Sequence, residues 1–128
     1  MIGYITIGTN DLARATKFYD AVLGEMGAKQ QWSNERMVSW GAAPRTPSVI
    51  VTKPYDGKNA DHGNGTMVAL LTSSPEVVGR VHQKALSLGA ADEGAPGYRG
   101  PEAQGFYGAY FRDLDGNKFA AFCMAPKK

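Results

Sequence analysis

The stretch that decides the fold runs from Phe106 to Met124 and reads FYGAYFRDLDGNKFAAFCM. Its first part, Phe106 to Arg112, is rich in aromatic residues, and its last part, Phe119 to Met124, is apolar. Turn residues, Asp113-Leu114-Asp115-Gly116-Asn117, separate the two parts, and this pattern predicts a β-hairpin. The second strand of the hairpin carries no carboxylate or imidazole group. That absence bears directly on the chemistry of the chain.

Length and charge limit the classes of function. A chain of 128 residues is expected to form one domain with a sizeable core. Its 14 basic and 12 acidic residues give a net charge of +2, with no basic cluster, so we expect no nucleic-acid partner. Cys123 is the only cysteine, which excludes an intrachain disulfide and favours a cytoplasmic location. No signal peptide and no membrane span are expected, because the first residues are not basic and no apolar run approaches 18 residues.

The rest of the chain is organised as two similar halves. A β-branched strand over residues 2–8 precedes a helix, which Asn10 or Asp11 can cap and which extends through Leu23. The pattern then predicts short strands at 28–32, 37–40 and 48–52, followed by a polar loop at 53–65. The same order recurs with a strand at 66–72, a helix at 75–88, and strands at 91–94, 106–112 and 119–124.

This order predicts an α+β fold made of two βαβββ modules. We expect a curved mixed sheet around a concave cup, with the helices outside. The single domain would then span residues 1–128, with the first module at 1–53, a linker at 54–65 and the second module at 66–126.

Several of these segments resemble the vicinal oxygen chelate superfamily, in particular its small glyoxalase-like branch. That superfamily includes glyoxalase I, bleomycin-resistance proteins and extradiol dioxygenases. The resemblance covers nearly the whole chain, and it rests on Ile2 through Leu23-Gly24 with Asn10-Asp11-Leu12 and Phe18-Tyr19, on Gly63-Asn64-Gly65-Thr66, on Gly94 to Arg99, on Phe106-Tyr107, and on Asp115-Gly116-Asn117. It implies a homodimer with the ligand in the cup.

Members of that superfamily usually hold a divalent metal through His and Glu residues on the strands that face the cup. Carried over position by position, the resemblance places these ligands at Tyr4, Met67 and Ala120. Methionine and alanine at two of the positions cannot hold a hard divalent metal, and the Tyr4 phenol would first have to ionise. We therefore expect no metal and no other cofactor.

A cup without metal would be apolar and aromatic. Alternation along the strands places Ile2 and Thr6 on the same face as Tyr4. The predicted ligand-binding residues are Tyr4, Met67, Ala120, Phe122, Arg99, Trp40 and Tyr107. Some of these aromatics can equally fill the core or a dimer seam, and Arg99 can equally be a surface or ion-paired residue.

Candidates for acid–base chemistry are few. His62 lies in the loop between the modules, and Tyr4 carries the only ionisable group at the mapped metal positions. Alternatively, His62 is a solvated loop residue without a role in catalysis. Cys123, flanked by Phe122 and Met124, is expected to be a buried small hydrophobe and no nucleophile.

Two main functional hypotheses follow. The first is a metal-independent protein that binds a small apolar or aromatic molecule, resembling the bleomycin-resistance members. The second is a lyase- or isomerase-type enzyme resembling lactoylglutathione lyase, with an altered active site that uses Tyr4 or His62. A third hypothesis is a structural homodimer whose own side chains fill the cup.

Overall fold

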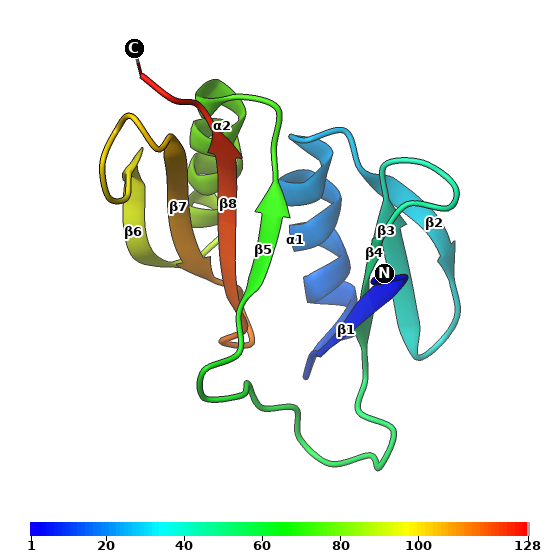
Figure 1. Cartoon of the computed structure of the whole chain (residues 1–128). Helices are drawn as coiled ribbons and strands as arrows, with labels where there is room; N and C mark the ends of the chain where they lie inside the picture. Colours follow the sequence, from blue (N-terminus) through cyan, green and yellow to red (C-terminus); the bar gives the residue numbers. More distant parts are fainter. Residues whose placement is uncertain (128) are drawn as a thin grey trace.

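The computed structural model describes residues 1–127 and has the predicted α+β architecture of two βαβββ modules (Figure 1). The first module contains β1 (Tyr4–Gly8), α1 (Leu12–Gly24), β2 (Lys29–Ser33), β3 (Met37–Gly41) and β4 (Ser48–Thr52). The second contains β5 (Val68–Leu71), α2 (Pro75–Ser87), β6 (Ala91–Tyr98), β7 (Phe106–Arg112) and β8 (Lys118–Met124). The repeated order expected from the sequence is therefore confirmed.

Each module forms a four-stranded mixed sheet of its own. The strand orders are β1-β4-β3-β2 and β5-β8-β7-β6, and the first strand of each module runs parallel to the last. Within residues 1–127, the edge strands β1 and β5 are not paired with each other, so the expected curved sheet is divided into two halves. Figure 1 shows the two halves on either side of α1.

The two helices cover one face of each sheet and leave the opposite face open. Helix α2 packs against β6, β7 and β8, whereas α1 packs against β2, β3 and β4 and also against α2. Two α1 rings, Phe18 and Tyr19, also lie beside the β7 and β8 rings Phe111 and Phe119. The core is thus shared between the modules.

Local chemistry explains where the helices begin. The Asp11 carboxylate accepts a hydrogen bond from the Arg14 amide at 3.0 Å, and the Ser74 hydroxyl accepts one from the Val77 amide at 3.3 Å. Such caps satisfy amides that have no partner within the helix. Pro75 then opens α2, where its missing N–H costs nothing.

The main departure from the predicted elements is β6, which runs on to Tyr98 and does not end at Gly94. Its pairing with β7 shifts register between Asp92 and Gly94 and again between Gly94 and Gly97. Such bulges accommodate glycine and proline in an edge strand. The strand therefore continues through residues 95–98, which the sequence pattern does not predict as strand.

The turn of the predicted hairpin also fastens the second module to the first. The Asp115 carboxylate accepts hydrogen bonds from the Thr9 hydroxyl at 2.6 Å and from the Asn10 amide at 2.9 Å. The Asn117 side chain donates to the carbonyl of Gly8 at 3.0 Å. Three bonds thus tie the β7–β8 turn to the junction between β1 and α1.

Asp113, in the same turn, bonds the Tyr19 hydroxyl of α1. Burial raises the pKa of Tyr19 well above its ordinary value, and the neighbouring negative charge of Asp113 adds to the effect. The phenol therefore stays protonated and donates to the Asp113 carboxylate throughout the neutral pH range.

Among the described residues, neither helix is long and apolar enough to cross a membrane.

Candidate functional site

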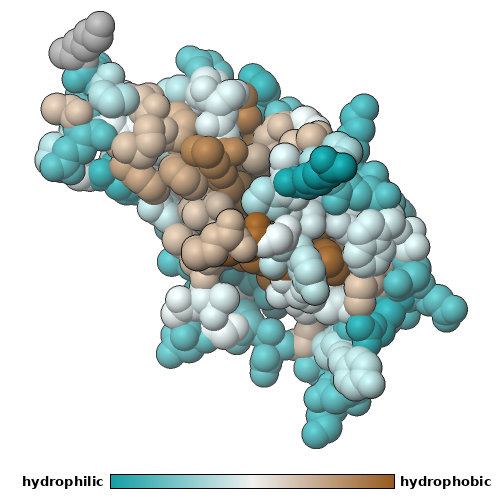
Figure 2. Space-filling model, turned by 45° about the vertical axis from the view of Figure 1, so that its right-hand side comes forward, coloured by the Kyte–Doolittle hydropathy of each residue, from teal (hydrophilic) through white to brown (hydrophobic). Residues whose placement is uncertain are grey.

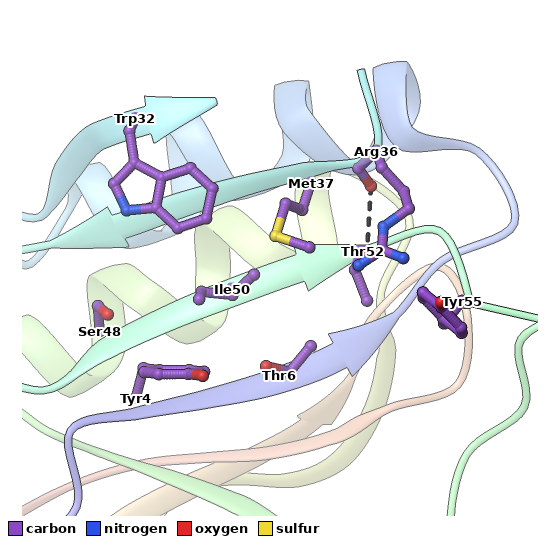
Figure 3. A pocket seen from close by; sticks show the side chains of 9 residues that line it. All are labelled: Tyr4, Thr6, Trp32, Arg36, Met37, Ser48, Ile50, Thr52 and Tyr55. Carbon is purple, nitrogen blue, oxygen red and sulfur yellow. Dashed lines mark hydrogen bonds between the residues drawn. The ribbon is translucent and has the colours of Figure 1, made fainter. Parts of the chain in front are cut away.

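The open face of the first sheet forms a hollow of about 540 Å³ (Figure 3). Side chains from all four strands of the sheet and from the following loop line it, namely Tyr4, Thr6, Trp32, Arg36, Met37, Ser48, Ile50, Thr52 and Tyr55. Alternation along the strands produces this face: Ile5, Ile7, Val49 and Val51 point to the core, and their neighbours point to the hollow.

One end of the hollow is aromatic. Tyr4 on β1 and Trp32 on β2 are 63% and 46% exposed, which is unusual for large aromatic residues without a partner. Figure 3 shows Ile50 of β4 between the two rings. Ile50 is only 5% exposed and forms the apolar floor of the hollow at this end. A flat apolar molecule can therefore lie on Ile50 and contact both rings.

The other end of the hollow is polar. The Arg36 guanidinium lies 5.1 Å from the centre of the Tyr55 ring, a cation–π geometry. The Thr52 hydroxyl donates to the carbonyls of Arg36 at 3.4 Å and Lys53 at 2.8 Å (Figure 3). Of the residues that the structure describes, Arg36 is the only charged one in the lining of the hollow.

The open face of the second sheet is more apolar. Phe106 and Phe122 stack with their ring centres 5.2 Å apart, and Tyr110 lies under both the Arg99 guanidinium and the Lys118 ammonium. Its side chains do not contribute to the hollow on the first sheet.

A groove of about 580 Å³ separates the edge strands β1 and β5. Its lining is mostly apolar and includes Ile2, Ile5, Met67 and Leu71. Figure 2 shows hydrophobic side chains gathered near the middle of the molecule, where the surface is recessed. Ile2 and Leu71, which are 55% and 65% exposed, leave much of this apolar surface in contact with water.

The predicted ligand-binding residues lie in several different places. Tyr4 lines the hollow, whereas Met67 precedes β5 and lines the groove. Phe122 lies on the open face of the second sheet, and Ala120 lies on that face but is completely buried. Arg99, also on that side, donates to the carbonyls of Ala95 and Gly97 at 2.6 and 3.0 Å.

The two remaining aromatic candidates pack against the core, and Trp40 also lines the groove between β1 and β5. Trp40 is 1% exposed, and its indole N–H donates to the Asp20 carboxylate at 2.9 Å. Tyr107 packs against the core and lies edge-on to Tyr98 at 5.2 Å. Their alternation on β3 and β7 places them on the helix-covered faces, and a ligand-binding role for either stays a prediction.

The two histidines differ in environment. His62 is exposed and lies against Gly116, where an added Cβ would come within 2.7 Å of its ring. It is not part of the lining of the hollow. His82 is buried on α2, and its Nε2 lies 3.1 Å from the carboxylate of Asp92. A hydrogen bond from the Gly94 amide, helped by His82, lowers the pKa of Asp92.

Cys123 is buried, as the sequence predicts for a small hydrophobe. Burial raises the pKa of its thiol, which lowers the fraction of reactive thiolate at neutral pH. The structure thus shows a thiol that packs in the core of the second module.

Comparison with known proteins gives the family. The family model described as Glyoxalase/Bleomycin resistance protein/Dioxygenase superfamily matches residues 1–121. The chain belongs to this superfamily. Its structure is similar to the crystal structure of a glyoxalase/bleomycin resistance protein from Albidiferax ferrireducens T118, with 34% identity, coverage of 96% of this chain and 98% of that chain, and a TM-score of 0.87.

More distant solved structures share the fold. A glyoxalase/bleomycin resistance protein/dioxygenase family enzyme from Burkholderia phytofirmans PsJN is 16% identical, with 95% of this chain and 97% of that chain covered and a TM-score of 0.74. A hypothetical protein, SA1046 from S. aureus, is 25% identical, with 96% of each chain covered and a TM-score of 0.69. No curated protein matches the sequence.

The residues of this chain do not fit the divalent metal that the superfamily resemblance implies. Tyr4, Met67 and Ala120 occupy the mapped ligand positions, and Ala120 is fully buried. Across residues 1–127, no three His, Cys, Asp or Glu side chains are grouped so that they could hold a metal ion. A metal centre of the superfamily type would need donor atoms that this arrangement does not supply.

Sequence reasoning missed most residues of the hollow, above all Arg36, Met37, Ile50 and Tyr55. Two signals point to them in retrospect. Ile50 pairs with Thr6 and Ser39, so the period-two rule that placed Thr6 beside Tyr4 extends to its neighbours across the sheet. Tyr55 follows β4 directly in a polar loop, where an aromatic residue has no core to fill.

Proposed function

We propose that this superfamily member binds a small planar apolar or aromatic molecule on the open face of the first sheet, without a metal ion. One observation carries the proposal: the hollow joins two exposed aromatic rings, an apolar floor and several hydroxyl groups, with no imidazole or carboxylate in its lining. Burial of an apolar ligand against such a lining contributes roughly 25 cal/mol per Å² of apolar surface. The chemistry thus favours retention of a ligand by contact and stacking.

A second candidate function is an enzyme of lyase or isomerase type, resembling lactoylglutathione lyase, with a non-standard active site. The Tyr4 phenol supports it, because this ionisable group points into the hollow (Figure 3). Tyr4 could act on a bound substrate as an acid or base. His62, the other candidate, lies outside the lining and would have to move to take part.

We also propose that the chain forms a homodimer, as the superfamily resemblance implies. The apolar groove beside the unpaired edges of β1 and β5 gives a second copy a surface to cover. Light scattering coupled to size exclusion should then give twice the chain mass of 13.7 kDa. Leu71→Asp should shift the protein toward the monomer, and a wild-type mass equal to one chain would contradict the dimer.

Ligand binding on the first sheet can be tested with a screen of small aromatic compounds by ligand-detected NMR. We expect at least one compound to bind the wild type, and Trp32→Ala to weaken its binding about tenfold through loss of stacking area. Leu88→Ala, at the exposed end of α2, is the matched control and should bind as the wild type does. An empty screen, or a Trp32→Ala variant of unchanged affinity, would contradict the proposal.

A further inference from the structure

Arg36 is a positive charge without an acidic partner in the described part of the chain. Every ion pair found there involves other residues, although Arg36 lines the hollow and is a half-buried residue. A half-buried charge that lacks a counter-ion loses part of its hydration without compensation. The Tyr55 ring compensates only in part, since a cation–π contact contributes less than a charge-assisted pair with an anion.

The position of Arg36 is also fixed by its backbone. Its carbonyl accepts a hydrogen bond from the Lys53 amide at 2.8 Å, which holds the start of β3 to the end of β4. The guanidinium is thus presented from a paired strand end, with its Cζ atom 5.1 Å from the centre of the Tyr55 ring. Such a planar fork is suited to two parallel hydrogen bonds with a carboxylate.

Strand register gives the separation between this charge and the aromatic end. Trp32 pairs with Ser39 across β2 and β3, and Arg36 precedes Ser39 by three residues. At about 3.3 Å per residue along a strand, the two ends lie roughly 10 Å apart. A ring on Ile50 between Tyr4 and Trp32 would therefore need a short chain to bring an anionic group within reach of the long Arg36 side chain.

We infer that the ligand of the hollow is a planar aromatic acid, whose ring lies at the Tyr4 and Trp32 end and whose carboxylate pairs with Arg36. The Thr6 hydroxyl lies between the two ends and can donate to the same carboxylate (Figure 3). This ligand class rests on the proposed binding function and narrows it.

Pairs of compounds that differ only in charge test the inference. The probes are 3-phenylpropanoate and 3-phenylpropanamide, together with indole-3-acetate and indole-3-acetamide, titrated into the full chain by calorimetry. In the wild type we expect each acid to bind about tenfold more tightly than its amide, the gain typical of a charge-assisted pair in a half-open site. Arg36→Gln should bring the ratio of the two affinities close to one, mainly because the acid binds more weakly.

The control variant is Lys53→Gln, which removes an equal charge from the adjacent exposed position outside the lining. It should keep the preference for the acid, and thermal unfolding should show both variants folded. Equal affinities for acid and amide in the wild type, or a preference that survives Arg36→Gln, would overturn the inference while the proposed function stands. Failure of these probes together with an empty aromatic screen would contradict both.

Discussion

Asp113→Ala is expected to lower the free energy of unfolding by about 3 to 4 kcal/mol, a large fraction of the stability of a domain of this size. The buried Asp113 carboxylate accepts hydrogen bonds from the Tyr19 hydroxyl, from the Asp115 and Asn117 amides at 2.9 and 2.8 Å, and from the Asn117 side chain at 2.9 Å. Alanine would leave these donors buried without an acceptor, and each such donor costs about 1 to 3 kcal/mol. The effects are not additive, because the turn can relax.

Urea unfolding followed by circular dichroism measures this loss. Asp56→Ala is the matched control, since the Asp56 carboxylate also accepts from a turn amide, that of Lys58 at 2.9 Å, but lies exposed. We expect its effect to stay within about 0.5 kcal/mol. Similar effects for the two substitutions would contradict the role of Asp113 as the centre of the contact between turn and helix.

Ala120→Glu is expected to cost about 3 kcal/mol or more, and to leave little folded protein. The superfamily resemblance assigns a metal-binding glutamate to position 120, where Ala120 is 0% exposed between its strand partners Ala69 and Tyr110. A glutamate there would either force these neighbours apart or bury a carboxylate without a counter-charge. The position has thus become part of the packed structure of the second sheet.

Ala69→Glu provides the control for this substitution. Ala69 pairs directly with Ala120 on the neighbouring strand and shares its face of the sheet, but it is exposed. The added side chain can reach water, so the change in unfolding free energy should stay below about 1 kcal/mol. Equal stability of the two variants, measured by thermal and urea unfolding, would show that position 120 still has room for a metal ligand.

Much of the fold could be predicted because short-range sequence patterns indicate the helices, strands and turns of each module. The Asp113 to Asn117 turn, the Asp11 cap and the alternation in β4 are short-range signals, and all three appear in the structure. The separation of the sheet into two halves could not be predicted in this way. It depends on how the edges of β1 and β5 are placed by α1, which is a property of tertiary packing.

The site could be predicted only in part. The resemblance predicted Tyr4, which lies in the hollow. Its neighbours there, Trp32 and Arg36, could not be predicted in the same way, because a bulge in β2 and the turn before β3 decide which face of the sheet they occupy. The β2 register shifts between Gln30 and Trp32, so simple alternation from Lys29 gives the wrong face for Trp32. Trp40 illustrates a second difficulty: the sequence pattern of an aromatic residue in a strand is the same for a buried core position as for a ligand site, and Trp40 is buried.

We propose that the hollow on the first sheet binds an aromatic ligand through its own side chains, without a divalent metal. The most direct test titrates the tightest-binding compound of the aromatic screen into protein kept in EDTA and into protein supplied with excess Ni²⁺, Zn²⁺ or Mn²⁺. We predict equal affinities within about twofold, because Tyr4, Trp32, Ile50 and Arg36 make the contacts. Binding that is lost in EDTA and restored by a metal ion would contradict the account and make a metal-dependent enzyme the better explanation.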